Sequence, residues 1–299
     1  MLKKNFVTKK AGTIAFNAAI FIPAIAMLLI SLVISVADID AADISIWLLL
    51  GISQLCIVAA GLGTIFYTKT NFIAAMTFNK KPKALNIVLL AVLSISLIVF
   101  VLPIQSAFLN LLQSIGIKLE SSVLEFDSFG VGGYIFAFIL VAIIPAFAEE
   151  IIYRGFVLEG NRQKKFDIVA IVISALLFTV MHKSIEQFIN PLILGFVMGF
   201  IYCATCSIWS TIILHFFNNA FVMVLSLIPG TEQFLLTNWW LLFPAAVVAA
   251  GMLLLIWKTN KAEQYEIEKP LIENEKHWNY LLIPGALYSL IILIYSMFA

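Results

Sequence analysis

Long apolar runs recur along the whole chain and constrain its fold more than any other feature. A helix of about 20 apolar residues spans the hydrocarbon core of a bilayer. The sequence contains nine windows of this kind, at residues 14–36, 46–67, 85–106, 132–159, 167–183, 189–206, 208–229, 239–257 and 279–298. This pattern predicts an all-α, polytopic membrane protein with nine transmembrane helices, and eight is the alternative count.

The composition also favours a protein embedded in lipid. Hydrophobic residues make up 62% of the chain and charged residues 12%, whereas soluble proteins average about 45–50% and about 25%. The net charge of +1 gives no reason to expect a nucleic-acid partner. Cys56, Cys203 and Cys206 all lie in apolar runs, where an odd number favours free thiols over disulfides or a redox or metal site.

The basic residues predict the orientation, because short loops rich in Lys and Arg stay on the cytoplasmic side. The loop after the first window carries Asp38, Asp40 and Asp43 and no basic residue, so we expect it outside. Basic residues gather at the N-terminus and in alternate loops: Lys3, Lys4, Lys9 and Lys10, then Lys69, Lys80, Lys81 and Lys83, then Arg154, Arg162, Lys164 and Lys165, then Lys258, Lys261, Lys269 and Lys276. These loops and the N-terminus are predicted to be cytoplasmic, with the first window retained as a transmembrane helix.

Two segments between the windows are predicted to lie outside the hydrocarbon. Residues 107–131 mix apolar and polar side chains, and we expect an amphipathic helix there, on the outer surface. Residues 258–277 are strongly charged and are predicted to form a cytoplasmic connector.

Polar side chains inside the windows point to function, because charges in a membrane are costly. They occur in PAFAEEIIYRGF with Glu149, Glu150 and Arg154, in ALLFTVMHK with His182, and in TIILHFFNNAF with His215, Asn218 and Asn219. Each also has a structural explanation. Glu150 can pair with Arg154 one helical turn later, His182 can sit at an interface, and His215 can hold two helices together.

Glu149 is harder to explain structurally, because Arg154 pairs more readily with Glu150 and leaves Glu149 as an unpaired carboxylate in the membrane. Helical rise from the predicted helix ends puts Glu149, His182 and His215 about 16, 22 and 10 Å from the cytoplasmic ends of their helices. We therefore expect the three side chains to meet in one cavity that opens to the cytoplasm, helped by a bend at Pro145.

These residues resemble the motifs of the CAAX-protease and bacteriocin-processing family (CPBP, also called Abi), and in particular type II CAAX prenyl endopeptidases. EEIIYR from Glu149 to Arg154 matches EExxxR, Phe178 to His182 matches FxxxH, and His215 to Asn219 matches HxxxN. The resemblance covers about residues 130–230. It implies a catalytic core of four helices at 131–230. No motif specifies the flanking regions, where the apolar windows predict about three transmembrane helices and an outer-surface segment in 1–130, and C-terminal transmembrane helices with the charged cytoplasmic connector in 231–299.

The resemblance implies catalytic roles for four of the motif residues. Glu149 resembles the general base that activates water, and His182 assists it. His215 and Asn219 resemble the pair that stabilises the oxyanion of the tetrahedral intermediate. Peptide hydrolysis needs both a nucleophilic water and a place for the developing negative charge, so this division agrees with the chemistry.

Three further motif residues resemble supporting groups. Glu150 and Arg154 would form an ion pair that positions their helix, and Phe178 would pack one turn before His182. Asn218 lies outside the motif and is a candidate further hydrogen-bond donor.

A zinc site is the alternative use of the same side chains, because two histidines and a glutamate are a known catalytic ligand set. Zinc would bind through Glu149, His182 and His215. The histidines lie in different windows, however, and the motif is not H-E-x-x-H. With the resemblance, this favours a metal-free glutamate mechanism without a cofactor.

Three classes of function are compatible with such a chain. An intramembrane endopeptidase is favoured because every motif position is intact. Its partners would be the lipid bilayer and a peptide or membrane-associated protein, prenylated or not, and the oligomeric state is left open. A non-catalytic scaffold, or an immunity or regulatory protein of the same fold, is the second class. A transporter with a proton relay is the third, and the sequence shows no internal repeat that would favour it.

Overall fold

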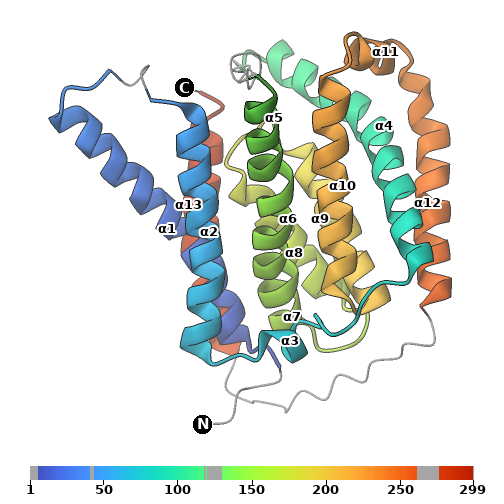
Figure 1. The fold of residues 1–299 in the computed structure, drawn as a ribbon, viewed down its shortest axis with the longest axis horizontal. Coiled ribbons are helices and arrows are strands. Elements are labelled where there is room, and N and C mark those ends of the chain that lie inside the picture. The colour runs from blue at the N-terminus through green and yellow to red at the C-terminus, as the bar shows by residue number, and fades with distance from the viewer. Residues whose placement is uncertain (1–5, 41–43, 118, 120–129, 261–275, 299) are drawn as a thin grey trace.

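The structure, a computed structural model, describes residues 6–40, 44–117, 119, 130–260 and 276–298, and its regular elements there are helices (Figure 1). The separate longer helices are α1 (Lys9–Val36), α2 (Ile46–Thr68), α4 (Ala84–Ser114), α8 (Ile168–Met181), α9 (Ile189–Thr205), α10 (Ile208–Ser226), α12 (Leu242–Thr259) and α13 (Ile283–Tyr295). One continuous central helix consists of α5 (Gly130–Phe138), η2 (Ile139–Ile143), α6 (Ile144–Glu150), η3 (Ile151–Leu158) and α7 (Glu159–Asn161). The short elements are α3 (Phe72–Ala75), α11 (Thr231–Thr237), η4 (Trp239–Leu241) and η5 (Lys276–Leu282).

Within the described residues, seven helices are long and apolar enough to cross a membrane, and they correspond to seven of the nine predicted windows. The other two windows form α8 and α9, with 14 and 17 residues. At the helical rise, α8 is about 21 Å long, which is less than the hydrocarbon thickness of about 30 Å. The chain is a polytopic, α-helical integral membrane protein, and α8 and α9 form a short hairpin inside it.

The helix of the third window, predicted at residues 85–106, differs most clearly from the prediction. α4 does not end near residue 106 but continues to Ser114, with Pro103 inside it. The separate amphipathic helix expected at 107–131 is therefore wrong for its first residues, because they extend α4 beyond the predicted window. Residues 118 and 120–129 of that segment, and 261–275 of the charged connector, lie outside the described residues.

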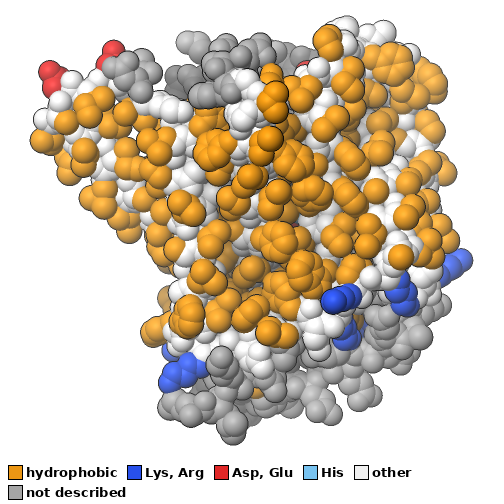
Figure 2. Space-filling view, viewed as in Figure 1, with side chains coloured by type: hydrophobic (Ala, Val, Ile, Leu, Met, Phe, Trp, Pro, Cys, Tyr) orange, Lys and Arg blue, Asp and Glu red, His pale blue; other side chains and the backbone are white. Residues whose placement is uncertain are grey.

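The basic residues gather at one end of the bundle, which we call the lysine-rich end. α1 and α4 begin at this end, and α2, α7 and α12 end there (Figure 1). Figure 2 shows Lys and Arg side chains along this end, acidic side chains at the opposite end, and a broad apolar face between them. The helices thus alternate in direction as the charge pattern predicts.

The central helix lies inside the bundle and positions the polar motifs. α1 packs against η3 on one side, and α10 packs against α6 and η2 on the other. The α8–α9 hairpin packs against η3 as well. Each element that carries a motif therefore contacts the central helix.

A close crossing of α1 and η3 at Gly12 gives a first test of this packing. A Cβ atom at Gly12 would lie 2.8 Å from the backbone carbonyl oxygen of Phe156, so the two helices must separate to admit it. We expect Gly12→Ala to destabilise the folded protein by about 1–3 kcal/mol, the usual cost of overpacking. Thermal unfolding of the purified protein measures this.

Gly251→Ala is the matched control, because a Cβ at Gly251 in α12 meets no atom within 4 Å. Its melting temperature should equal or slightly exceed that of the wild type, since alanine favours the helix. Equal melting temperatures for Gly12→Ala and the wild type would contradict the close crossing.

Candidate active site

The three predicted motifs come together around one cavity of about 710 Å³. Its lining includes Glu149 from α6, Phe178 from α8, His182 directly after α8, and His215, Asn218 and Asn219 from α10. The fold therefore collects, from three helices, the side chains that the sequence singled out.

Glu150 and Arg154 lie behind the cavity wall and are fully buried. Arg154 Nη1 donates to Glu150 Oε1 over 2.7 Å, and Arg154 Nη2 donates to the carbonyl oxygen of Gly195 over 3.1 Å. The guanidinium also stacks over the ring of Phe178, 4.6 Å from its centroid. Arg154 therefore joins the central helix to both α8 and α9. A buried pair of this kind needs such extra partners to offset its desolvation.

Glu150 also fixes the orientation of His215, which the sequence did not predict. His215 Nδ1 lies 3.0 Å from Glu150 Oε1. A carboxylate only accepts hydrogen bonds, so Nδ1 is the donor in this contact. The other ring nitrogen, Nε2, then faces Glu149, with 4.0 Å between Nε2 and Glu149 Oε2. His215 thus lies between the two adjacent carboxylates of the EEIIYR motif and is hydrogen-bonded to Glu150.

Phe178 packs at the centre of the site and holds His182. The His182 Nδ1 atom lies 2.9 Å from the carbonyl oxygen of Phe178, which fixes Nδ1 as the protonated nitrogen and leaves Nε2 for the cavity. The Phe178 ring meets the rings of His182 and His215 edge-on, at centroid distances of 5.0 and 5.9 Å. One aromatic side chain therefore contacts both histidines and Arg154.

A proline-induced gap in the central helix explains the position of Asn219. Pro145 has no backbone N–H, so the carbonyl of Val141, four residues earlier, lacks its helical partner. Asn219 Nδ2 donates to that carbonyl over 2.9 Å. Two π-helical segments, η2 and η3, flank α6, and π-bulges of this type are frequent at functional sites. The bond ties α10 to the central helix just before the glutamates.

The cavity extends from Glu149 and His215 away from the lysine-rich end. Its walls reach Gln105 on α4 and Ser226, the last residue of α10. The sequence analysis expected an opening at the predicted cytoplasmic end, which is the lysine-rich end, and the cavity lies on the other side of the site. The reason is the length of α8: it ends at Met181, and the space beyond it is left to the cavity.

The cavity lining also contains polar residues that the sequence analysis missed. Lys183 and Glu186 belong to the turn between α8 and α9, and Gln54 belongs to α2. Gln54 is 7% exposed, and its Oε1 atom has no hydrogen-bond partner among the described residues. Gln105 holds the turn by donating to the carbonyl of Glu186 and accepting from the backbone N–H of Asn190. In the sequence, Lys183 and Glu186 were marked only by the polar stretch KSIEQ between two apolar windows.

The described residues contain no group of three His, Cys, Asp or Glu side chains arranged to hold a metal ion. Of the possible zinc ligands, His215 already donates through Nδ1 to Glu150, and its Nε2 lies 4.0 Å from Glu149. The donor atoms present are thus not in a ligand arrangement, and the metal-free mechanism stays a prediction.

Comparison with known proteins supports the family resemblance. Residues 131–221 match the family described as type II CAAX prenyl endopeptidase Rce1-like. A candidate membrane peptidase of Bacillus subtilis (strain 168), YdiL, is 30% identical over 91 residues, which is 30% of this chain and 37% of the relative. The chain thus matches little more than a third of that relative's length. No solved structure matches the chain.

Proposed function

We propose that the chain is an intramembrane endopeptidase, because residues 131–221 match the Rce1-like type II CAAX prenyl endopeptidase family. The observation that carries the proposal is the contact of Glu149 and His215 beside His182 in the cavity, because these are a base, a proton-bearing donor and a second imidazole at one place. The substrate class we propose is a peptide or a membrane-associated protein.

In the proposed reaction Glu149 takes a proton from a water molecule as the water oxygen attacks the peptide carbonyl carbon. His182 orients the water by accepting a hydrogen bond at Nε2, since its Nδ1 is occupied by Phe178. Glu149 then gives the proton to the leaving amine nitrogen as the C–N bond breaks. General acid and base catalysis by one positioned carboxyl group balances the proton between the two steps.

The oxyanion that forms in this reaction needs donors, and we propose His215 and Asn219. His215 can donate from Nε2 when its ring carries both protons, and Glu150 at Nδ1 stabilises that imidazolium. Asn219 uses one amide hydrogen for Val141, and a primary amide has a second one to offer. Both side chains line the cavity next to Glu149.

The metal-free mechanism predicts that exhaustive chelation leaves cleavage unchanged. Dialysis of the purified protein against a strong zinc chelator, followed by the peptide assay and by metal analysis of the same sample, measures this. Loss of cleavage that only added zinc restores would establish the zinc alternative through Glu149, His182 and His215.

The proposed function is tested by cleavage of candidate membrane peptides by the wild type and by His182→Ala and His215→Ala variants, each checked for folding. We expect the wild type to cut and both folded variants to be inert. If the folded variants keep the cellular effect of the wild type, the chain acts as a scaffold instead.

We further propose that the lysine-rich end and the N-terminus are cytoplasmic, on the basis of the charge distribution.

A further inference from the structure

The cavity occupies only the half of the bundle that is distant from the lysine-rich end. α2 begins at that distant end, and the cavity is lined by its first half, from Leu50 to Ile57. α4 begins at the lysine-rich end, and its contribution starts only at Ile98 and reaches Gln105. The cavity therefore extends from Glu149 and His215 toward the end of the bundle that is distant from the lysine-rich end.

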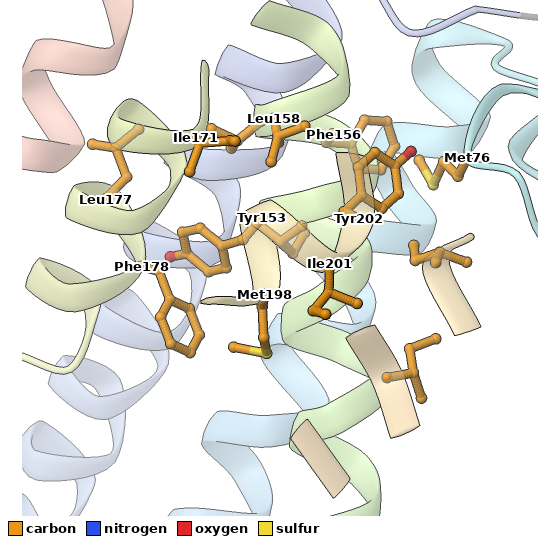
Figure 3. Close-up of a cluster of buried hydrophobic side chains, with 14 of the residues drawn as sticks. Met76, Tyr153, Phe156, Leu158, Ile171, Leu177, Phe178, Met198, Ile201 and Tyr202 are labelled. Atoms are coloured by element: carbon orange, nitrogen blue, oxygen red, sulfur yellow. The ribbon is translucent and has the colours of Figure 1, made fainter. Parts of the chain in front are cut away.

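Packed side chains fill the bundle on the lysine-rich side of the site. Tyr153, Phe156, Met198 and Tyr202 are each 0% exposed and belong to one core cluster. Figure 3 shows these side chains within one cluster of buried hydrophobic residues. Arg154 is fully buried in the same region. A peptide has no path through such a core, because protein interiors are close-packed.

The charges assign the two ends to the two sides of the membrane. Among the described residues, Lys and Arg occur near the lysine-rich end with two exceptions, the buried Arg154 beside the site and Lys183 in the α8–α9 turn. Asp38 and Asp40 follow α1 at the opposite end. By the positive-inside rule the lysine-rich end is cytoplasmic, so the cavity lies in the extracytoplasmic half.

We infer that the active site is reached from the extracytoplasmic side, and that its substrate is a peptide segment already exported to, or anchored in, the outer half of the membrane. This inference rests on the proposed function. Its physical basis is the short α8, which leaves the outer half of the bundle to the cavity, together with the packed core on the cytoplasmic side.

The lining fits an extended peptide chain. Apolar walls from α4 and α10, such as Val101 and Val222, suit apolar side chains, and the unpartnered Oε1 of the buried Gln54 can accept a backbone N–H. Lys183 makes no ion pair with the described residues and contacts the Tyr288 ring at 5.1 Å, so its ammonium group is available for an acidic group of the peptide. Apolar walls with a few placed polar groups are typical of ligand cavities.

Thiol labelling tests the inference without requiring activity. Gln187→Cys puts a thiol at an exposed position of the cavity lining, and Lys164→Cys puts one at an exposed position of the lysine-rich end. Whole cells and permeabilised cells that express each full-length variant are treated with a charged, membrane-impermeant maleimide. The wild type, with its buried Cys203 and Cys206 and partly buried Cys56, is the control.

We expect Gln187→Cys to be labelled in whole cells and Lys164→Cys only after permeabilisation, with rates that differ at least about tenfold, because a charged reagent crosses hydrocarbon poorly. Labelling of Gln187→Cys only after permeabilisation overturns the inference. So does no labelling of it in either sample, and so does labelling of Lys164→Cys in whole cells.

A second measurement separates this inference from the proposed function. Purified protein is sealed in vesicles of known orientation, and a charged, impermeant test peptide is supplied outside or inside. Cleavage only at the extracytoplasmic face supports both the proposed peptidase function and access from that face. Cleavage only at the cytoplasmic face overturns the inference and leaves the peptidase standing. Labelling as expected, with no cleavage from either face or in detergent, contradicts the peptidase alone.

Discussion

Glu149→Gln should reduce the rate of peptide cleavage by about 10²–10⁴-fold, the range that general base catalysis contributes. The substitution keeps the size of the side chain and its place in the cavity wall, and it removes the carboxylate that we propose as the acceptor of the water proton. Single-turnover cleavage with a membrane peptide measures the chemical step. The melting temperature should change little, because no ion pair with Arg or Lys is lost at this position among the described contacts.

Glu232→Gln is the matched control, because Glu232 is exposed on α11, away from the cavity lining. It should cleave at the wild-type rate. A Glu149→Gln protein that is folded and cleaves within a few-fold of the wild type would falsify the role of Glu149 as base. Attention would then move to His182 as the group that activates water.

Glu150→Ala should be the most destabilising single change in the site, by about 3–5 kcal/mol, because it leaves a buried charge on Arg154 without its partner. Glu150 and Arg154 are both 0% exposed and 2.7 Å apart. The same change removes the acceptor that orients His215, so cleavage should be lost even at temperatures where the variant is folded. Chemical or thermal unfolding and the cleavage assay are measured on the same preparation.

The double variant Glu150→Leu/Arg154→Met separates stability from orientation. Replacing both members of a buried pair with apolar side chains is often close to neutral, so the double variant should unfold at a higher temperature than Glu150→Ala. It should still be inactive, because Nδ1 of His215 has no acceptor. Recovery of cleavage together with stability would show that Glu150 acts only through Arg154.

A second buried ion pair provides the control for this experiment. Arg162 Nη2 lies 2.5 Å from Glu159 Oε2, and Tyr202 donates to the same oxygen over 3.2 Å, but none of the three lines the cavity. Glu159→Gln should therefore lower the stability and leave the cleavage rate of the folded fraction unchanged. Equal loss of cleavage in Glu159→Gln and Glu150→Ala would mean that the assay reports the amount of folded protein rather than the orientation of His215.

The membrane fold could be predicted from the sequence because hydrophobic length is a local property. Each apolar window contains a helix, and the loops alternate in charge as expected. The length of α8 was not predictable in the same way. Its window runs from 167 to 183, but the helix ends at Met181, and the polar turn that follows faces the cavity. Hydropathy does not distinguish a helix that crosses the bilayer from one that stops within it.

The candidate site shows a similar division between local and distant contacts. The pairing of Glu150 with Arg154 follows from their spacing on one helix. The contact of Glu150 with His215 joins residues 65 positions apart, and only the packing of α10 on the central helix creates it. The direction of the cavity is a property of the whole bundle, so motif spacing carried no information about it.

The bond from Asn219 to Val141 has a consequence for how the protein is made. It connects residues 78 positions apart in the chain, so the central helix is synthesised before α10. Until α10 has docked, the carbonyl freed by Pro145 has no donor from this bond, and His215 is not yet beside the glutamates. The candidate site therefore assembles only after α10 has been synthesised and has packed against the central helix.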